Sequence, residues 1–80
     1  MHYVYILRSI NSPDQIYTGS TSNIEDRMRS HNKGANNHTS KFKPWELVWY
    51  CAFAKQRQAE DFEQYLKTAS GIAFKRKRFL

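Results

Sequence analysis

Two basic side chains stand at a spacing that could hold an anion and move a proton. Arg27 and His31 are four residues apart, so in a helix they are neighbours on one side. Arginine can grip a phosphate through two parallel N–H bonds, and histidine can transfer a proton near neutral pH. Such a pair on its own is usually a surface feature, so a functional interpretation needs support from other segments.

Tyrosines supply the second group of candidates. Tyr5 and Tyr17 lie in two apolar segments that we expect to pair as a hairpin, and on a shared face their hydroxyls would converge. A phenol with its ordinary pKa near 10 is a poor base unless nearby cations lower that pKa. Arg27 and a bound metal would be such cations. Tyrosines in strands are ordinarily packing residues whose hydroxyl contacts solvent, so a packing role and a catalytic role both stay open.

The third candidate is a carboxylate. Glu63 falls at the edge of the apolar stripe that Phe62 and Leu66 form on a predicted helix, whereas Glu60 and Asp61 point away from that stripe. A carboxylate at such a border needs a cation, a metal ion or a hydrogen-bond donor. From position alone, a salt bridge to a lysine or arginine is the more frequent solution.

The elements that must position these residues begin with a hairpin and a helix. Residues 3–7 and 15–19 read as strands, the first buried on both faces, with a turn cluster between them. Ser22 and Glu25 fit a capping box at a helix start. Ile24, Met28 and His31 would share a face of that helix, and Gly34 would end it. Residues 34–44 are expected to form a long exposed loop that includes a solvated His38.

The second half of the chain predicts one more strand and two helices. Trp45–Phe53 is the strongest strand signal, with Trp45 and Trp49 on one face as core residues. A helix over 57–68 follows, broken by Ser70 and Gly71, and a short basic helix closes the chain over 72–79. The buried stripe of the first of these two helices would contain four residues, Ala59, Phe62, Leu66 and Ala69. The order β-β-α-β-α-α predicts an α+β fold, a small three-stranded antiparallel sheet with helices packed against it.

Length and composition set the class of protein. Eighty residues make one small domain, residues 1–80, with 40% hydrophobic residues for a core. No apolar run is long enough for a membrane span and no secretory signal opens the chain, so no membrane partner is expected. The single Cys51 excludes an internal disulfide and fits a reducing compartment, which favours a cytoplasmic location. Zinc-ligand spacing, a phosphate-binding glycine loop and a nucleophile elbow are all missing.

Charge points to a polyanion. The net charge is +6, and the stretches from Arg27 to Lys43 and from Leu66 to the end contain no acid. Such stretches suit nucleic acid, although a solvated surface is the alternative. The candidate nucleic-acid-binding residues are Arg29, Lys33, Lys41, Lys43, Lys67, Lys75 and Arg76.

The ordered set of motifs resembles the GIY-YIG nuclease superfamily. The segments YVYIL and IYTGST, then Arg27 and His31, and the C-terminal stretch AEDFEQYLKTASGIAFKRKRF are similar to its small, single-domain bacterial branch. The resemblance covers nearly the whole chain. No single motif is specific, but the order of Tyr, Tyr-x-Gly, Arg-x-x-x-His and a later helical Glu is much more so.

This resemblance implies a metal-dependent endonuclease of weak sequence specificity that hydrolyses phosphodiester bonds in DNA, or in RNA, with a role in DNA repair or processing. It implies one Mg²⁺ or Mn²⁺ ion held by Glu63, and Arg27 on the scissile phosphate. Tyr5 or Tyr17, helped by the other or by His31, would deprotonate the attacking water. We expect a monomer or weak dimer without an obligate protein partner.

Departures from the family pattern keep two alternatives open. Ser20 stands where some members carry a lysine, and no Asn follows Glu63 as it does in many relatives. Tyr3 and Thr18 replace the first Gly and second Ile of the motifs, which alters packing rather than chemistry. The first alternative is a catalytically weak or inactive nucleic-acid-binding module of the same fold. The second is a protein-interaction domain that its basic residues merely solubilise.

Overall fold

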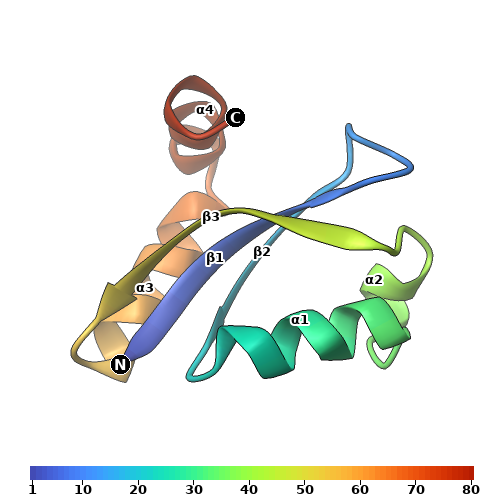
Figure 1. Ribbon diagram of the computed structural model, residues 1–80. Helices are drawn as coiled ribbons and strands as arrows, with labels where there is room; N and C mark the ends of the chain where they lie inside the picture. Colours follow the sequence, from blue (N-terminus) through green and yellow to red (C-terminus); the bar gives the residue numbers. More distant parts are fainter.

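A computed structural model describes residues 1–80 and has the expected α+β architecture (Figure 1). The strands are β1 (His2–Ser9), β2 (Ile16–Thr21) and β3 (Trp45–Phe53), and the helices are α1 (Ile24–Lys33), α2 (Asn37–Ser40), α3 (Gln56–Leu66) and α4 (Ala69–Arg78). The strands form one antiparallel sheet in the order β2-β1-β3, which confirms the predicted three-stranded sheet. None of the helices combines the length and apolar character needed to cross a membrane.

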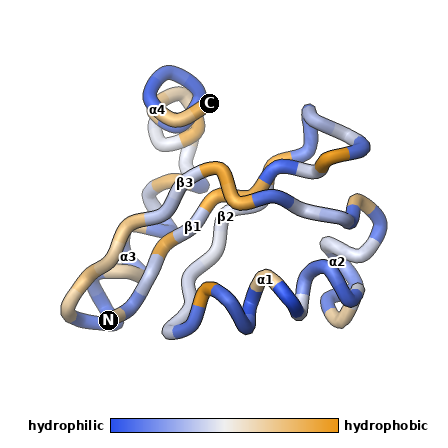
Figure 2. Tube along the Cα trace, in the orientation of Figure 1, coloured by the Kyte–Doolittle hydropathy of each residue, from blue (hydrophilic) through white to orange (hydrophobic).

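Strand β1 lies at the centre of the sheet and supplies core residues to both of its faces. Val4, Tyr5, Ile6 and Leu7 are at most 1% exposed, as the run of apolar residues predicts. Tyr5 and Leu7 pack on the face that carries α1, whereas Val4 packs against α3 on the opposite face. Hydrophobic residues follow β1 and β3, while α1 is largely hydrophilic (Figure 2). The sheet therefore separates two small cores.

The prediction for the two tryptophans of β3 is half wrong. Trp45 packs with Tyr5 and Leu7 on the α1 face, but Trp49 stacks on Phe79 at a ring-centroid distance of 4.1 Å, on the other face. The register between β1 and β3 shifts between Ile6 and Leu7, so β3 contains one extra residue. Because side chains alternate along a strand, this bulge turns Trp49 away from the face of Trp45.

Helix α1 begins one residue later than the capping box suggests. Asn23 is the N-cap, and its side-chain oxygen accepts a hydrogen bond from the Asp26 backbone N–H. Asparagine caps a helix as well as serine does. The Thr21 hydroxyl also donates to the Asn23 carbonyl and accepts from the Asn23 backbone N–H, which fixes the N-cap. The predicted C-terminal signal is confirmed, because Gly34 adopts a left-handed conformation with φ of 77°.

The break between α3 and α4 also differs from its prediction. Thr68 caps α4 by accepting a hydrogen bond from the Gly71 N–H, so Ser70 and Gly71 lie inside the first turn of α4. Ala69 is exposed and does not belong to the buried stripe of α3. A side chain at position 71 would overlap the Tyr65 carbonyl, so Gly71 serves the close approach of the two helices and not a break.

Residues 34–44 are more ordered than an exposed loop. They contain the one-turn helix α2, in which Thr39 is 1% exposed. Its carbonyl accepts a hydrogen bond from the indole Nε1 of Trp45 at 2.9 Å. His38 is exposed, as expected. This segment therefore supports the α1 face of the sheet from below, as Figure 1 shows.

Candidate active site

The two tyrosines converge over a glycine on the edge strand of the sheet. Tyr5 pairs with Gly19 and Leu7 pairs with Tyr17, so both tyrosines lie on the α1 face, and their ring centroids are 6.2 Å apart. A Cβ atom at position 19 would lie 2.5 Å from the Tyr5 hydroxyl and 3.0 Å from the Tyr17 ring. Gly19 therefore leaves the space that the Tyr5 phenol occupies beside β2.

Replacing Gly19 with alanine is expected to displace Tyr5, because that side chain is 1% exposed and has no free space to move into. The added methyl should destabilise the fold by about 1–3 kcal/mol and misplace the hydroxyl. Urea unfolding followed by circular dichroism measures the change in free energy. A Gly19→Ala protein as stable as wild type would show that this contact does not position Tyr5.

A buried hydrogen-bonded chain runs from Tyr5 through His31 to Thr39. The Tyr5 hydroxyl is 3.0 Å from His31 Nε2, and His31 Nδ1 is 2.9 Å from the Thr39 hydroxyl. Tyr5 makes no other side-chain hydrogen bond, so its O–H donates to Nε2. The histidine proton is then on Nδ1 and donates to Thr39, whose own hydroxyl has the Asn36 carbonyl as acceptor at 3.5 Å. This arrangement satisfies every member of the chain.

Burial dominates the proton affinities of this chain. It raises the pKa of Tyr5 above its usual range, and Tyr17 and Glu63 add to that effect while Arg27 opposes it. Arg27 lowers the pKa of Tyr5, as expected of a nearby cation, but burial outweighs this effect. Burial also lowers the pKa of His31 below its ordinary 6.5, with Arg27 acting in the same direction. At neutral pH the pair is a neutral phenol and a neutral imidazole.

Glu63 reaches the same edge of the sheet from the opposite face. Its Oε1 accepts a hydrogen bond from the Ser20 hydroxyl at 2.6 Å, and its Oε2 pairs with Lys67 Nζ at 2.6 Å. Ser20 immediately follows Gly19, and the Glu63 side chain is only 14% exposed. The carboxylate is therefore fixed next to Gly19, and its charge contributes to raising the pKa of Tyr5. The salt bridge that position alone favoured is present as well.

Arg27 faces a cleft next to this carboxylate. The cleft has a volume of about 300 Å³ and runs between the β2–α1 corner and α3. Its lining includes Ser20 and Arg27 together with Gln56 and Glu60 of α3. Arg27 makes no salt bridge, in contrast to Arg29, which pairs with Asp26 on the exposed side of α1. The guanidinium is thus available to an anion in the cleft.

Side chains from four separate elements thus lie around Gly19 and Ser20 of β2. Tyr5 comes from β1, Tyr17 from β2, Arg27 from α1 and Glu63 from α3, and His31 adds a second residue of α1. No group of three or more His, Cys, Asp and Glu side chains is placed to bind a metal ion. Glu63 is the carboxylate that Ser20 holds at this point of β2. The arrangement combines a guanidinium without an ion-pair partner, a carboxylate and a buried Tyr5–His31–Thr39 hydrogen-bonded chain.

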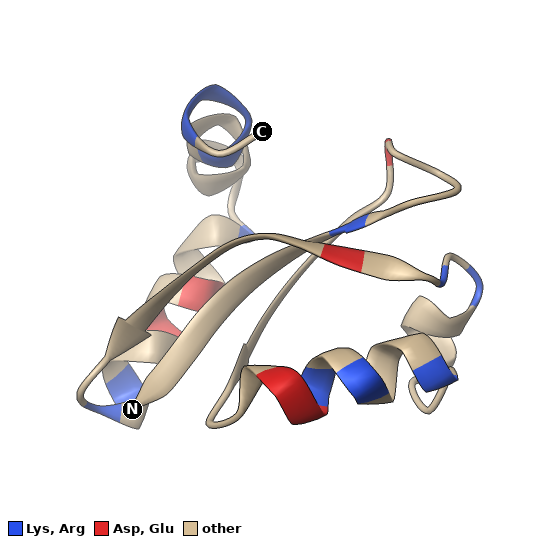
Figure 3. Ribbon diagram, viewed as in Figure 1, with Lys and Arg blue, Asp and Glu red and all other residues tan.

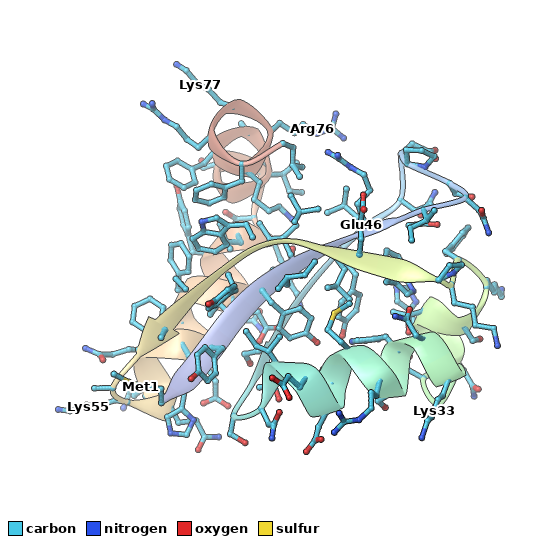
Figure 4. The ribbon with its side chains drawn as sticks, viewed as in Figure 1. Met1, Lys33, Glu46, Lys55, Arg76 and Lys77 are labelled. Atoms are coloured by element: carbon cyan, nitrogen blue, oxygen red, sulfur yellow. The ribbon has the colours of Figure 1, made fainter.

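The basic residues do not gather into one patch. Figure 3 shows lysine and arginine residues on the second half of α1, near the start of β3 and on α4. Lys33 at the end of α1 and Arg76 on α4 lie at different ends of the molecule (Figure 4). Lys67 contacts Glu63, and Lys75 is 8% exposed and donates to the Thr18 hydroxyl. These two lysines are the expected nucleic-acid-binding residues that adjoin the site.

Three residues of the site had no distinctive signal in the sequence. Ser20 orients Glu63, Thr39 fixes the protonated nitrogen of His31, and Glu60 lines the Arg27 cleft. Serine and threonine are common in loops and strands, and Thr39 lies in a polar segment that predicts exposure. Only the capping pattern of Asn36, which begins α2, could have indicated local order there.

Comparison with known proteins gives one family and several relatives. The GIY-YIG catalytic domain matches residues 1–77. A UPF0213 protein of Clostridium perfringens is 38% identical over 68 residues, which cover 84% of this chain and 71% of that protein. A UPF0213 protein of Staphylococcus haemolyticus is 36% identical over 70 residues, covering 86% and 83% of the two chains. The structure-specific endonuclease subunit SLX1 of Debaryomyces hansenii is 38% identical over 71 residues, 80% of this chain and 20% of that protein.

Proposed function

Because the chain belongs to the GIY-YIG catalytic domain family, we propose that it is a divalent-metal-dependent endonuclease that hydrolyses phosphodiester bonds in DNA. The observation that carries this proposal is the placement of Arg27, Glu63 and Tyr5 around Gly19 and Ser20 of β2. The relative named as a structure-specific endonuclease subunit supports the same reaction class. We include a role in DNA repair or processing in the proposal. Supercoiled plasmid should be nicked with Mn²⁺ or Mg²⁺ and left intact with EDTA; nicking that ignores EDTA would contradict the proposal.

Glu63 is the residue that would hold the metal ion. Its two oxygens are hard donors suited to Mg²⁺ or Mn²⁺, and the Ser20 hydroxyl adds a third oxygen beside them. The Lys67 ammonium already contacts Oε2, so this position attracts a cation. A hydrated ion needs one carboxylate, and substrate oxygens complete its shell. Such an ion supplies charge stabilisation at the reacting phosphate.

Arg27 binds the scissile phosphate. Its guanidinium faces the cleft that Ser20 also lines and has no carboxylate partner in the protein. Two parallel N–H bonds to the non-bridging oxygens would orient the phosphate and stabilise the charge that develops on it. Weak sequence specificity follows from the same chemistry, because cations and hydroxyls that contact backbone oxygens do not distinguish bases.

The Tyr5–His31 pair accepts the proton of the attacking water. Tyr5 alone is a poor base because burial raises its pKa, but its O–H already donates to the neutral His31 Nε2. As the water transfers a proton to the Tyr5 oxygen, the phenolic proton moves to Nε2, and His31 becomes the net base. Thr39 keeps the other ring nitrogen protonated. The rings of Tyr17 and His31 pack in a T-shaped arrangement with their centroids 4.9 Å apart, which holds the imidazole in place.

Activity should fall at acid pH with a midpoint below pH 6.5. The pKa of His31 in the folded protein is below 6.5. The imidazole that accepts the proton therefore stays neutral until the pH falls to that lowered pKa. His31→Gln should reduce kcat/KM by about 10²–10⁴-fold and remove this acid limb. The groups facing His31 are Tyr5, Tyr17 and Arg27, and the profile is measured on plasmid nicking at constant ionic strength.

Stability changes in the same pH range and serves as the control. The unfolded chain binds a proton at His31 more readily than the folded chain, so the free energy of unfolding decreases as the pH falls below about 6.5. Circular dichroism at each pH shows whether the protein is still folded. An acid limb with an unchanged midpoint in His31→Gln would exclude His31 as the net base.

One observation favours the alternative of a non-catalytic nucleic-acid-binding module. Lys67 forms an ion pair with Glu63 in the free protein, and a carboxylate that stays paired in this way would not bind a metal ion. Such a module would bind DNA in a salt-sensitive way and show no metal-dependent nicking at any pH. The plasmid assay with Mn²⁺ separates the two functions.

A further inference from the structure

A second groove adjoins the candidate active site along β2. It has a volume of about 360 Å³, and its lining includes Tyr17 and Thr18 of β2, His38 of α2, Lys67 at the end of α3 and Lys75 of α4. No carboxylate lines it. Two lysines and a histidine from three elements therefore surround one concave surface, which makes it a candidate site for an anion.

Lys75 is an unusual lysine because it is buried without a counterion. The residue is 8% exposed, its Nζ donates to the Thr18 hydroxyl at 2.8 Å, and it forms no salt bridge. Burial, with the neighbouring charges of Lys67 and Arg76, lowers the pKa of Lys75. A buried cation without a partner costs stability, and the ammonium group has two further N–H bonds to donate. An anion in the groove would accept them.

Lys67 links this groove to the candidate metal ligand. Its side chain is 45% exposed, lines the groove and pairs with Glu63 Oε2 in the free protein. Thr18 and Ser20 are separated only by Gly19, so the groove and the Glu63 carboxylate lie at successive positions of one strand. The Lys67 side chain therefore lies between an anion beside Lys75 and the Glu63 carboxylate.

We propose that this groove binds the backbone phosphate adjacent to the scissile one, with Lys75 as the fixed ligand and Lys67 as a ligand that leaves Glu63 when the phosphate arrives. The proposal rests on the proposed nuclease function and deepens it. Departure of Lys67 frees the Glu63 oxygen for the metal ion. The structure thus assigns to two lysines a role distinct from that of the exposed basic residues of α4.

The test is DNA binding in EDTA, where cleavage does not interfere. Lys75→Met replaces the ammonium with an apolar group of similar length and should weaken binding of a short fluorescein-labelled duplex about tenfold, measured by fluorescence anisotropy. The slope of log affinity against log salt should decrease by about 1. Lys77→Met, on the exposed side of the same helix, is the matched control and should change affinity less than about twofold. Equal effects of the two substitutions would overturn the proposal.

Lys67→Met provides a second variant if Lys75→Met is poorly folded, and a double-mutant cycle tests whether the two lysines share one phosphate. Thermal unfolding should give Lys75→Met a midpoint equal to or above wild type, because an apolar side chain removes an unpaired buried charge. Lys67→Met alters an exposed residue and should weaken binding by itself. If both lysines contact one phosphate, Lys67→Met should weaken binding less in the Lys75→Met background. Strictly additive effects would place the two lysines on separate phosphates and contradict the shared subsite.

Free phosphate and a backbone phosphate offer the groove the same chemistry. Titration of inorganic phosphate into the wild type, followed by ¹⁵N–¹H spectra at constant ionic strength, should cause no saturable shift at Thr18 and Lys75. Saturable binding of inorganic phosphate, with duplex affinity unaffected by Lys75→Met, would assign the groove to the free ion instead. These experiments involve no cleavage. A wild type that fails to nick plasmid would contradict the proposed function, whereas the binding measurements would still test whether the groove binds a phosphate.

Discussion

Glu63→Gln is expected to reduce metal-dependent cleavage by about a thousandfold or more while the protein remains folded and bound to DNA. Glutamine keeps the size of the side chain and one oxygen that can accept from Ser20, but it removes the charge that attracts the metal ion. Several kcal/mol of transition-state stabilisation depend on that ion, and each 1.4 kcal/mol is about a factor of ten in rate. Single-turnover cleavage of a labelled duplex in Mn²⁺ measures the loss.

Asp61→Asn is the matched control for this substitution. Asp61 is an exposed carboxylate on the same helix, and it neither contacts Ser20 nor lines the Arg27 cleft. Its removal changes the net charge as Glu63→Gln does and should leave the rate within about twofold. Anisotropy in EDTA should show that Glu63→Gln still binds the duplex. Equal cleavage by Glu63→Gln and wild type would mean that the nicking activity comes from another protein in the preparation.

Arg27→Ala is expected to reduce the cleavage rate by about 10²–10³-fold at saturating DNA, because the guanidinium stabilises charge that is largest in the transition state. Arg27→Lys should recover only part of the loss, since an ammonium cannot make two parallel N–H bonds to one phosphate. The change should appear mainly in kcat and less in KM. Removing Arg27 should also shift the pKa of His31 upward, because the arginine contributes to lowering it.

The control for Arg27 is another exposed arginine outside the cleft. Arg57→Ala removes one positive charge from α3 and should alter the rate only slightly at moderate salt. NMR titration of the His31 ring protons in Arg27→Ala and Arg57→Ala compares their effects on the His31 pKa. If Arg57→Ala slowed cleavage as much as Arg27→Ala, the effect would be one of general charge, and a specific phosphate contact would be excluded.

Strongly patterned segments made much of the fold predictable. The apolar run of β1 and the aromatic run of β3 predict strands because few other structures can bury such sequences, and both are strands. Gly34 ended α1 as expected. The face of Trp49 was not predictable, because one extra residue in β3 reverses the alternation and leaves no mark in the composition. The predicted start of α1 was one residue early because Ser22 and Asn23 are both good N-cap residues.

The relative positions of several candidate side chains were predictable, but their surroundings were not. Spacing placed Arg27 beside His31, and hairpin pairing placed Tyr5 on the face of Tyr17. The link between His31 and Thr39 depends on how residues 34–44 fold back under the sheet, which is a tertiary event. The burial of Lys75 likewise follows from the approach of α4 to Thr18, a contact between residues 57 positions apart. Long-range polar contacts of this kind have no local pattern.

The most direct test of the account is the location of the bound cation. Substoichiometric Mn²⁺ added to ¹⁵N-labelled protein broadens the resonances of nearby amides. We predict that broadening is strongest at Gly19, Ser20 and Glu63, extends to Tyr5, and disappears in Glu63→Gln. Broadening centred on other acidic residues, such as Asp26 on the exposed side of α1, with no effect of Glu63→Gln, would contradict a single catalytic site at this edge of the sheet.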